Sequence, residues 1–502
     1  MKRVLWTGLV GLSLVAAAAC SSDDGETGSV GGSGASGGSA AGGSAAGGGG
    51  SGGSSVGQTH ATAGVTLTEI AIYQGVKRSL MVGGEPVDSD VPLIAGRDAL
   101  LRVFYTTDAA FPGGEVTGRL NLAGGEPLEV RGALGAASTD AELESTLNFE
   151  IPGDRIADAM SWSVEVLSDG EGEDSAASKF PAEGLSEVAI EGKQNTFRLI
   201  LAPFRYTADG SGRLPNLDEV QVAKIRDRIK GLYPVSDVEV TVREPADWSG
   251  TLSPNGDGWQ SLGITLSGFR NADGESADVY YYGIFNPAET FRGYCGNGCL
   301  LGVTLLNNSP PDVGTPFLRL ALGVGYENYA AGTAAHELGH AHGREHVDCG
   351  GPDGVDRKYP YDGETIGSWG YDITSKQLKD PAVYSDIMGY CSRQHISDYT
   401  YRALHERGQR INQPYVVGDF NYDIVTVDGS GQAEFATTLE RQSPIAGDPV
   451  DVTAFDAHGA RAVRGEFFRY DHLPGGWLLV PQDAPLTRAE FVVEGVRYAV
   501  QR

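Results

Sequence analysis

The stretch Thr333–Cys349, TAAHELGHAHGREHVDC, decides how the centre of this sequence is interpreted, because it holds four of the chain's nine histidines. His336 and His340 are four residues apart, so on a helix both imidazoles lie on one face, within reach of one ion. Glu337 follows the first histidine, where it can reach a water molecule on that ion without binding the ion itself. The spacing therefore predicts a helix that carries two metal ligands and a general base.

A third ligand is expected after a turn. Gly343 is predicted to break the helix, because glycine readily adopts the positive φ that such a turn needs. His346 can then reach the same ion from the other side. Three imidazoles with one open position are typical of a catalytic zinc site, whereas a structural site is closed by a fourth protein ligand. His342, two residues from His340, is expected to point away from the metal, on the helix surface or beside the ligands.

The pattern His-Glu-x-x-His-x-x-Gly-x-x-His, from His336 to His346, resembles that of the metzincin clan of zinc endopeptidases. That clan has a Met-turn downstream, and the sequence SDIMGYC places Met388 forty-two residues after His346. The resemblance implies that Met388 forms a hydrophobic floor under the zinc. It also implies that Tyr390 can approach the metal and help in catalysis; the alternative is that Tyr390 is a buried core residue. No family within the clan is assigned.

Together these residues predict the hydrolysis of peptide bonds by zinc-activated water. Bound zinc lowers the pKa of water to about 7. Glu337 would take a proton from this water as it attacks the scissile carbonyl, and pass it to the leaving amine. Zinc, with Tyr390, would stabilise the oxyanion that develops. Because the three ligands must be neutral imidazoles, activity is expected to fall as the pH drops through their titration.

The sequence around the motif predicts a catalytic domain of the α/β (α+β) class over residues 193–412. TFRLILAPFRY (196–206) reads as a strand and NLDEVQVAKIRDRIKGLYP (216–234) as an amphipathic helix. VSDVEVTVRE (235–244) and ADVYYYGIFNP (277–287) read as two further strands. This order, followed by the helix with the histidines, is typical of an α/β arrangement. The resemblance implies a metzincin-like fold for the domain.

A β-rich domain is predicted on each side. Over residues 61–192, short alternating runs bounded by Gly, Pro and Asp predict an antiparallel β-sandwich, in which Leu101, Val103 and Tyr105 share one face. This region has no histidine or cysteine, so we expect a spacer or, alternatively, a substrate-docking module. Residues 415–502 predict a small β domain, again without evident chemistry.

Residues 1–19 have the positively charged start and short apolar run of a secretory signal peptide. AAAAC resembles a bacterial lipobox, which makes Cys20 the lipidated first residue of the mature protein; the alternative is ordinary cleavage after Ala-x-Ala that leaves Cys20 free. The Gly/Ser-rich residues 20–60 are typical of a flexible tether. We therefore expect an exported lipoprotein, at the outer membrane or cell surface or released from it. No candidate transmembrane helix follows Ala19.

The net charge of −28 excludes nucleic acid as a partner, since a polyanion needs a basic face. The expected partners are a protein or glycoprotein substrate and the membrane, and the chain is expected to be a monomer. A glycoprotein substrate is suggested because GSWGYDI (367–373) resembles a segment of large secreted bacterial metzincins that act on glycoproteins. The resemblance also suggests a calcium ion in the acidic loop at residues 348–364; the alternative is a solvated loop.

Four cysteines besides Cys20 are expected to pair in an exported chain, and they allow three connectivities. The favoured pairs are Cys295–Cys299, which closes a small loop, and Cys349–Cys391, which would tie the segment after His346 to the one after Met388. A second zinc site is the alternative, although the sequence lacks paired short Cys motifs. No cysteine-switch motif is apparent.

The sequence is also compatible with two other functions. A cell-surface binding or adhesion lipoprotein could carry an inactive peptidase fold, but the presence of Glu337 argues against it. A zinc enzyme of another type could use a carboxylate such as Glu364 as its third ligand. Gly343 and His346 stand at the metzincin offsets, which argues against that alternative.

Overall fold

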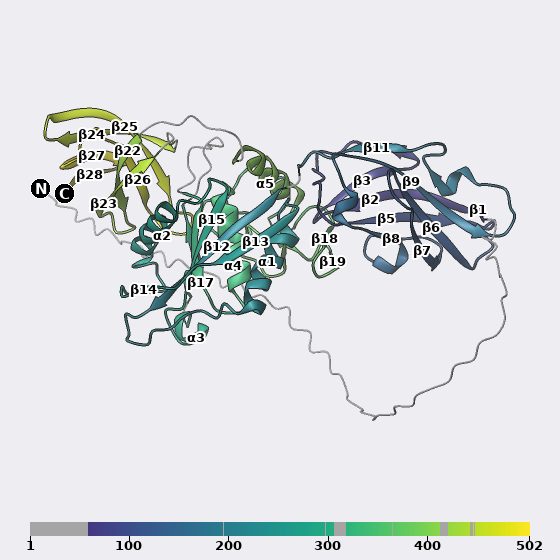
Figure 1. Cartoon of the computed structure of the whole chain (residues 1–502), viewed down its shortest axis with the longest axis horizontal. Helices are drawn as coiled ribbons and strands as arrows, with labels where there is room; N and C mark the ends of the chain where they lie inside the picture. Colours follow the sequence, from purple (N-terminus) through teal and green to yellow (C-terminus); the bar gives the residue numbers. More distant parts are fainter. Residues whose placement is uncertain are drawn as a thin grey trace, which may run out of the picture.

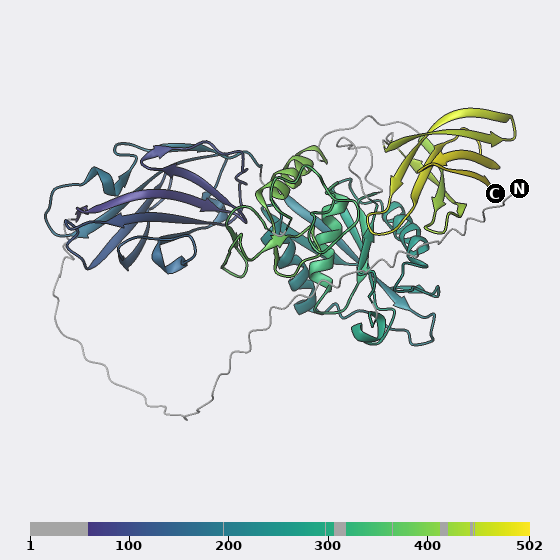
Figure 2. The same cartoon turned by 180° about the vertical axis from the view of Figure 1, so that it is seen from behind.

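The computed structural model is mostly β-structure with few helices, and its three β-rich parts follow one another along the long axis (Figures 1 and 2). The predicted signal peptide, Cys20 and Glu364 lie outside the described residues. Among the residues that the structure describes, no helix is both long and apolar enough to cross a membrane. The structure describes residues 59–193, 195–296, 298–305, 318–363, 365–411, 420–441, 445 and 447–502.

The N-terminal part consists of two antiparallel sheets. The first has the order β1-β9-β6-β7, with β10 and β11 also paired to β9; its strands are β1 (Thr59–Ala61), β6 (Glu115–Leu122), β7 (Leu128–Ala133), β9 (Ala159–Asp169), β10 (Lys179–Phe180) and β11 (Ser186–Ala189). The second has the order β4-β3-β2-β5-β8; its strands are β2 (Val65–Tyr73), β3 (Lys77–Val82), β4 (Glu85–Pro86), β5 (Ala99–Thr107) and β8 (Leu147–Ile151).

Side chains from both sheets form one buried core, in which Leu101 and Phe149 of one sheet meet Trp162 and Val164 of the other. Strand β5 does not show the expected alternation, because it is buried on both faces from Ala99 to Tyr105. Its second face is covered by Tyr371 of the central part, in a cluster with Leu100 and Phe104. This contact attaches the N-terminal part to the centre of the molecule.

The central part is built on a mixed sheet with the order β13-β12-β15-β17-β16, in which only β16 runs antiparallel to its neighbour. Strand β14 extends the pairing with β12 in parallel. The strands are β12 (Thr196–Tyr206), β13 (Asp237–Val242), β14 (Ala246–Trp248), β15 (Val279–Phe285), β16 (Gly302–Thr304) and β17 (Leu320–Val324).

Within the described residues of this region, five helices accompany the sheet: α1 (Glu219–Leu232), α2 (Trp259–Asp273), α3 (Phe291–Tyr294), α4 (Ala330–Ala341) and α5 (Asp398–Ile411). Two small two-stranded sheets complete the region, namely β18 (Gly370–Asp372) with β19 (Gln377–Lys379), and β20 (Ser385–Asp386) with β21 (Gln394–His395).

Strand β15 shows how the layers are organised, because its side chains alternate between two cores. Tyr280 and Tyr282 join the core formed with α1 and α4, whereas Tyr281 joins the core formed with α2. Helices α1 and α4 therefore cover one face of the sheet and α2 covers the other. Helix α4, which carries the first histidines, packs its Ala334 and Leu338 onto the sheet.

The C-terminal part is a seven-stranded antiparallel sheet with the order β23-β22-β26-β25-β24-β27-β28. Its edge strands β23 and β28 contact each other, so the sheet curls around a core of its own. The strands are β22 (Phe420–Val427), β23 (Ala433–Arg441), β24 (Asp448–Asp456), β25 (Gly459–Arg469), β26 (Gly476–Pro481), β27 (Arg488–Val493) and β28 (Val496–Gln501).

The outer face of this sheet packs on the central part. Trp477 and Phe468 belong to the same buried cluster as Trp259 and Leu262 of α2, and Figures 1 and 2 show the sheet beside that helix. The shared apolar cluster determines where the C-terminal sheet is docked, and therefore which of its turns faces the histidines.

Both favoured disulfides are present. Cys295 bonds to Cys299, and Cys349 bonds to Cys391. The second bridge joins the segment that follows His346 to the segment that follows Met388. It thereby links two stretches of chain that lie against the histidine helix.

Replacing both Cys349 and Cys391 by serine is expected to lower the free energy of unfolding by about 4 kcal/mol, because entropic stabilisation grows with the length of the closed loop. This bridge spans 42 residues. Urea unfolding of the oxidised chain and the variant measures the difference. The control is removal of the Cys295–Cys299 bridge, which spans only 4 residues and should cost about 2 kcal/mol. Equal losses would contradict the expectation.

Candidate metal centre

Helix α4 brings His336, Glu337 and His340 into the interior, where they are 7%, 2% and 0% exposed. The helix ends at Ala341, and Gly343 follows with a φ of 82°. The sequence predicted a glycine turn at this point, and the positive φ explains why a residue without a Cβ is suited to it. The chain then folds back.

The returning segment places His346 beside the other two histidines. The Nε2 atom of His340 lies 3.0 Å from Nε2 of His336 and 3.1 Å from Nε2 of His346. These separations bring the three nitrogens within reach of one cation. The structure thus brings together the three residues that the sequence singled out as metal ligands.

Hydrogen bonds to the opposite side of each ring orient these nitrogens. Each of the three histidines donates its Nδ1 proton to a backbone carbonyl, which leaves the Nε2 lone pair directed at the cluster. The acceptors for His336, His340 and His346 are the carbonyl oxygens of Ile387, Arg344 and Asp353, at 2.7, 2.5 and 2.6 Å respectively. Three buried lone pairs that converge in this way fit a zinc ion, which accepts imidazole nitrogen readily.

The electrostatics agree with a ligand role. Burial lowers the pKa of His336 and His340 well below the usual value, and the neighbouring imidazoles lower it further. Burial, followed by the proximity of His472, lowers the pKa of His346 to about 3. All three rings are therefore neutral near pH 7, which is the state that binds a metal ion.

Met388 lies against the helix between the two histidine positions. It is 1% exposed, and a Cβ at Gly339 would collide with its sulphur atom. Its backbone carbonyl accepts a hydrogen bond from Val347 N at 3.0 Å. The preceding carbonyl, of Ile387, is the acceptor for His336. The segment around Met388 therefore supports two of the ligand-bearing stretches at once.

Glu337 points into the same interior. Burial raises the pKa of its carboxyl to about 8. A Cβ at position 302 would overlap the carboxyl group, so Gly302 of β16 leaves the space that it needs. One carboxylate oxygen, Oε1, lies 3.0 Å from Nε2 of His472. A buried carboxylate with a raised pKa is suited to accept and return a proton near neutral pH.

Asp471 and His472 were not predicted. They lie in residues 470–475, here called the β25–β26 turn, whereas the sequence indicated no chemistry in the C-terminal region. A ring nitrogen of His472 lies within 4.8 Å of the ligand nitrogens of His336, His340 and His346. Sequence reasoning therefore missed two side chains of the C-terminal region that lie at the histidine cluster. The only signal was a histidine beside a turn, YDHLPGG, more than a hundred residues from the motif.

Tyr390 lies at the edge of the cluster. Its ring centre is 5.0 Å from that of His346 and 5.9 Å from that of His336. Its hydroxyl is hydrogen-bonded to Nδ1 of His472. The phenol is thus close to the candidate metal position and only partly buried.

His342 does not lie on the helix surface. It is 6% exposed, and its ring stacks on Tyr280 with the centres 4.5 Å apart. Its Nδ1 bonds to the carbonyl of Leu338 at 2.7 Å. The surface prediction is wrong because the aromatic residues of the central sheet cover this side of the turn. His342 is not among the clustered ring nitrogens.

The acidic loop after His346 does not gather its carboxylates in the part that is described. Asp356 accepts hydrogen bonds from Arg344 at 3.0 Å and from the hydroxyl of Tyr399 at 2.8 Å. The two groups of potential metal ligands found among the described residues include no acidic residue of this loop. The calcium ion stays a prediction.

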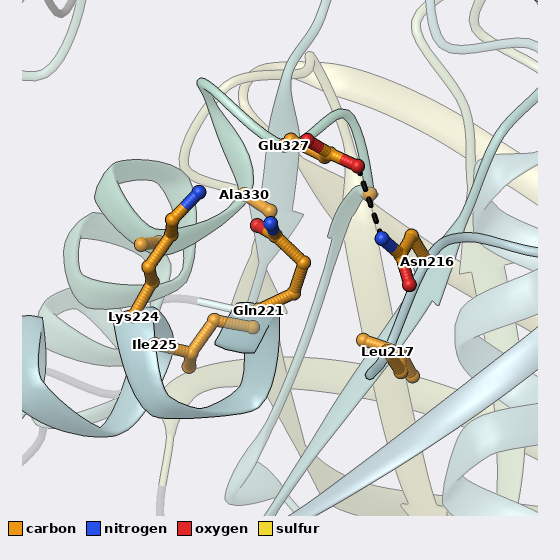
Figure 3. Close-up of a pocket in the computed structure, with 9 residues that line it drawn as sticks. Asn216, Leu217, Gln221, Lys224, Ile225, Glu327 and Ala330 are labelled. Atoms are coloured by element: carbon orange, nitrogen blue, oxygen red, sulfur yellow. Dashed lines mark hydrogen bonds between the residues drawn. The ribbon is translucent and has the colours of Figure 1, made fainter. Parts of the chain in front are cut away.

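Two hollows lie away from the histidine cluster. One, between the start of α1 and the start of α4, is lined by Asn216, Gln221 and Glu327, and the Asn216 amide donates to Glu327 at 3.0 Å (Figure 3). The other is lined by Phe197 and His342 among others. Neither is lined by a predicted ligand, so the site is identified by its side chains rather than by a cavity.

One protein-family model, Peptidase M66, matches residues 321–411. It describes a family of zinc metallopeptidases. The matched stretch begins within β17 and ends with α5, and it contains the predicted ligands and Glu337 but not Asp471 or His472. No curated protein shows a significant match to the chain. The family match and the buried histidine cluster both support a zinc-dependent peptidase.

Proposed function

We propose that this chain is an exported endopeptidase of the metzincin type, which uses zinc held by His336, His340 and His346. The observation that carries the proposal is the convergence of three buried Nε2 atoms whose rings are each fixed by a backbone carbonyl. The Met-turn sequence at Met388 supports the metzincin assignment. The substrate class is a protein or glycoprotein, and the anchor is a lipid on Cys20.

Each side chain of the site has a role in hydrolysis. Zinc, when bound, supplies a Lewis acid that lowers the pKa of water to about 7 and polarises a carbonyl. Glu337 takes the proton of the attacking water and returns it to the leaving amine, a task that suits its raised pKa. The Tyr390 hydroxyl donates a hydrogen bond to the oxyanion that develops on the substrate. Met388 and the carbonyl acceptors keep the three imidazoles in place.

Removing the metal tests the proposal. The purified chain is expected to contain a single zinc ion and to cleave casein, and treatment with 1,10-phenanthroline should abolish cleavage, because the proposed Lewis acid is lost. Adding zinc back should restore it. Metal analysis and casein cleavage provide the measurements. A chain that binds no zinc at all would exclude the proposal.

The second candidate is a surface-binding lipoprotein with an inactive peptidase fold. It becomes the better explanation if zinc is bound but no variant of the chain cleaves protein. The burial and raised pKa of Glu337 favour the enzyme, because a carboxyl poised in this way beside three metal ligands serves no purpose in a binding module.

A further inference from the structure

The β25–β26 turn is held against the central sheet at its base. Asp471 accepts a hydrogen bond from the backbone nitrogen of Thr304 at 3.0 Å, and its own nitrogen bonds to the Thr304 carbonyl at 3.3 Å. Leu305 pairs with Tyr470 in an isolated bridge. The turn therefore continues the edge of β16, the strand that borders Glu337.

The tip of the turn engages the groups assigned to catalysis. His472 is hydrogen-bonded through Nε2 to Glu337 at 3.0 Å and through Nδ1 to the Tyr390 hydroxyl. Its ring lies 4.7 Å from that of His346 and 5.3 Å from that of His336, measured between centres. The side chain is 8% exposed. The imidazole thus occupies the space that a substrate carbonyl needs in order to lie between the metal ligands and Glu337.

Asp471 adds a second carboxyl group to the same place. Its side chain is 1% exposed, and Oδ2 lies 3.5 Å from Nε2 of His340 and 3.2 Å from Nε2 of His472. It is also clustered with Glu337. Two adjacent buried carboxyl groups are costly unless a proton or a cation compensates them. A dication at the histidine cluster supplies that compensation when both the turn and the metal are in place.

We propose that His472 is a fourth, displaceable ligand of the metal centre, and that the β25–β26 turn thereby holds the chain in a latent state. This inference rests on the proposed function. Three imidazoles leave one position for water or substrate in a catalytic zinc site, and a fourth protein ligand closes it. Asp471 is the positioning residue that anchors the turn to Thr304. Substrate reaches Glu337 only when the turn withdraws.

The turn can withdraw without unfolding the sheet that carries it. The C-terminal sheet has its own core, which includes Val452, Leu478 and Phe491, and it docks on α2 through Trp477. His472 and Asp471 contact the site, whereas Tyr470 and Leu473 of the same turn belong to or pack against the cluster that contains Trp477. Opening therefore exchanges the hydrogen bonds and the metal ligand at Asp471 and His472, while the C-terminal sheet keeps its own core and its contact through Trp477.

The full chain loaded with cobalt(II) in place of zinc provides the test, with acetohydroxamate as a probe for the fourth position. In the parent, the visible spectrum is expected to respond weakly to the probe. In His472→Ala, the spectrum should change on loss of a nitrogen ligand, and the apparent dissociation constant of the probe should fall by at least about tenfold, because a larger fraction of molecules is open. Casein cleavage by the zinc form should rise in parallel.

Two further variants make the result specific. Asp471→Ala keeps His472 but removes the side-chain hydrogen bond that anchors the turn to Thr304, and it is expected to increase probe binding as well. His458→Ala is the control. It changes a histidine in the β24–β25 turn, at the other end of β25, whose side chain is 83% exposed, and it should behave as the parent.

The other possible outcomes distinguish failure of this inference from failure of the proposed peptidase function. The inference is overturned if the parent binds acetohydroxamate as tightly as His472→Ala, or if His472→Ala loses cleavage while its cobalt spectrum stays that of the parent. The latter result would make His472 a catalytic residue in an open site. If no form of the chain binds cobalt or zinc, the proposed peptidase function itself fails, and the inference fails with it.

Discussion

Replacing Glu337 by glutamine is expected to reduce casein cleavage by about 10²- to 10⁴-fold, the range that a positioned general base contributes, while the zinc content stays unchanged. Glutamine has nearly the same shape but cannot accept the proton of the attacking water. The three histidines keep their carbonyl acceptors, so metal binding does not depend on the carboxylate. Cleavage assays and metal analysis on the same samples measure both quantities.

The effect of Glu337→Gln is best measured both in the parent chain and in a chain that carries His472→Ala, because the β25–β26 turn contacts Glu337. If that turn limits activity, the parent will be slow, and the effect of Glu337→Gln will be clearest in a chain that also carries His472→Ala. The control is Glu345→Gln in the same motif, since Glu345 is not part of either clustered group. Full activity of Glu337→Gln in the open background would remove Glu337 from the mechanism.

Replacing His346 by alanine is expected to weaken zinc binding by more than about 100-fold, because even the loss of a residue that only orients a ligand costs 10- to 100-fold. His346 lies on the returning segment, and its Nε2 atom is 3.1 Å from Nε2 of His340. Its loss leaves the two helix histidines and the displaceable His472, so the ion loses one of its three ligands that are fixed by a backbone carbonyl. Competition with a chelator of known affinity gives the dissociation constant.

His342 offers the matched control. It lies in the same eleven-residue motif, yet it stacks on Tyr280 in the core. His342→Phe preserves the aromatic contact and should keep zinc binding at the parent value. If His346→Ala retained its zinc at the parent affinity, the third ligand would have to be another residue, and His472 of the same cluster would be examined first, followed by the carboxylate of Glu364.

Local sequence patterns were enough to predict two elements that precede the motif. The expected strand at 196–206 coincides with β12, and the expected helix at 216–234 contains α1. The reason is that side-chain periodicity reports which face of an element is buried, and a strand or helix buries one face wherever it lies in the fold. The i, i+4 spacing of His336 and His340 likewise determines that both rings share a face of α4.

The sequence also predicted contacts between residues that lie only a few positions apart in the chain. Gly343 turns the chain with positive φ, and His346 returns because only a few residues separate it from the helix. These features depend on geometry over short stretches of chain, which a sequence pattern records directly.

Only the tertiary structure placed Asp471 and His472 beside Glu337. Their position depends on how the C-terminal sheet docks on α2 through Trp477 and Phe468. No periodicity encodes such a contact, because it is determined by the shape of two separately packed surfaces rather than by the spacing of residues along one element. The burial of His342 has the same cause, since the residues that cover it come from β12 and β15. The sequence by itself thus identified the three predicted ligands and the predicted base, whereas the docking of distant elements decided what lies over them.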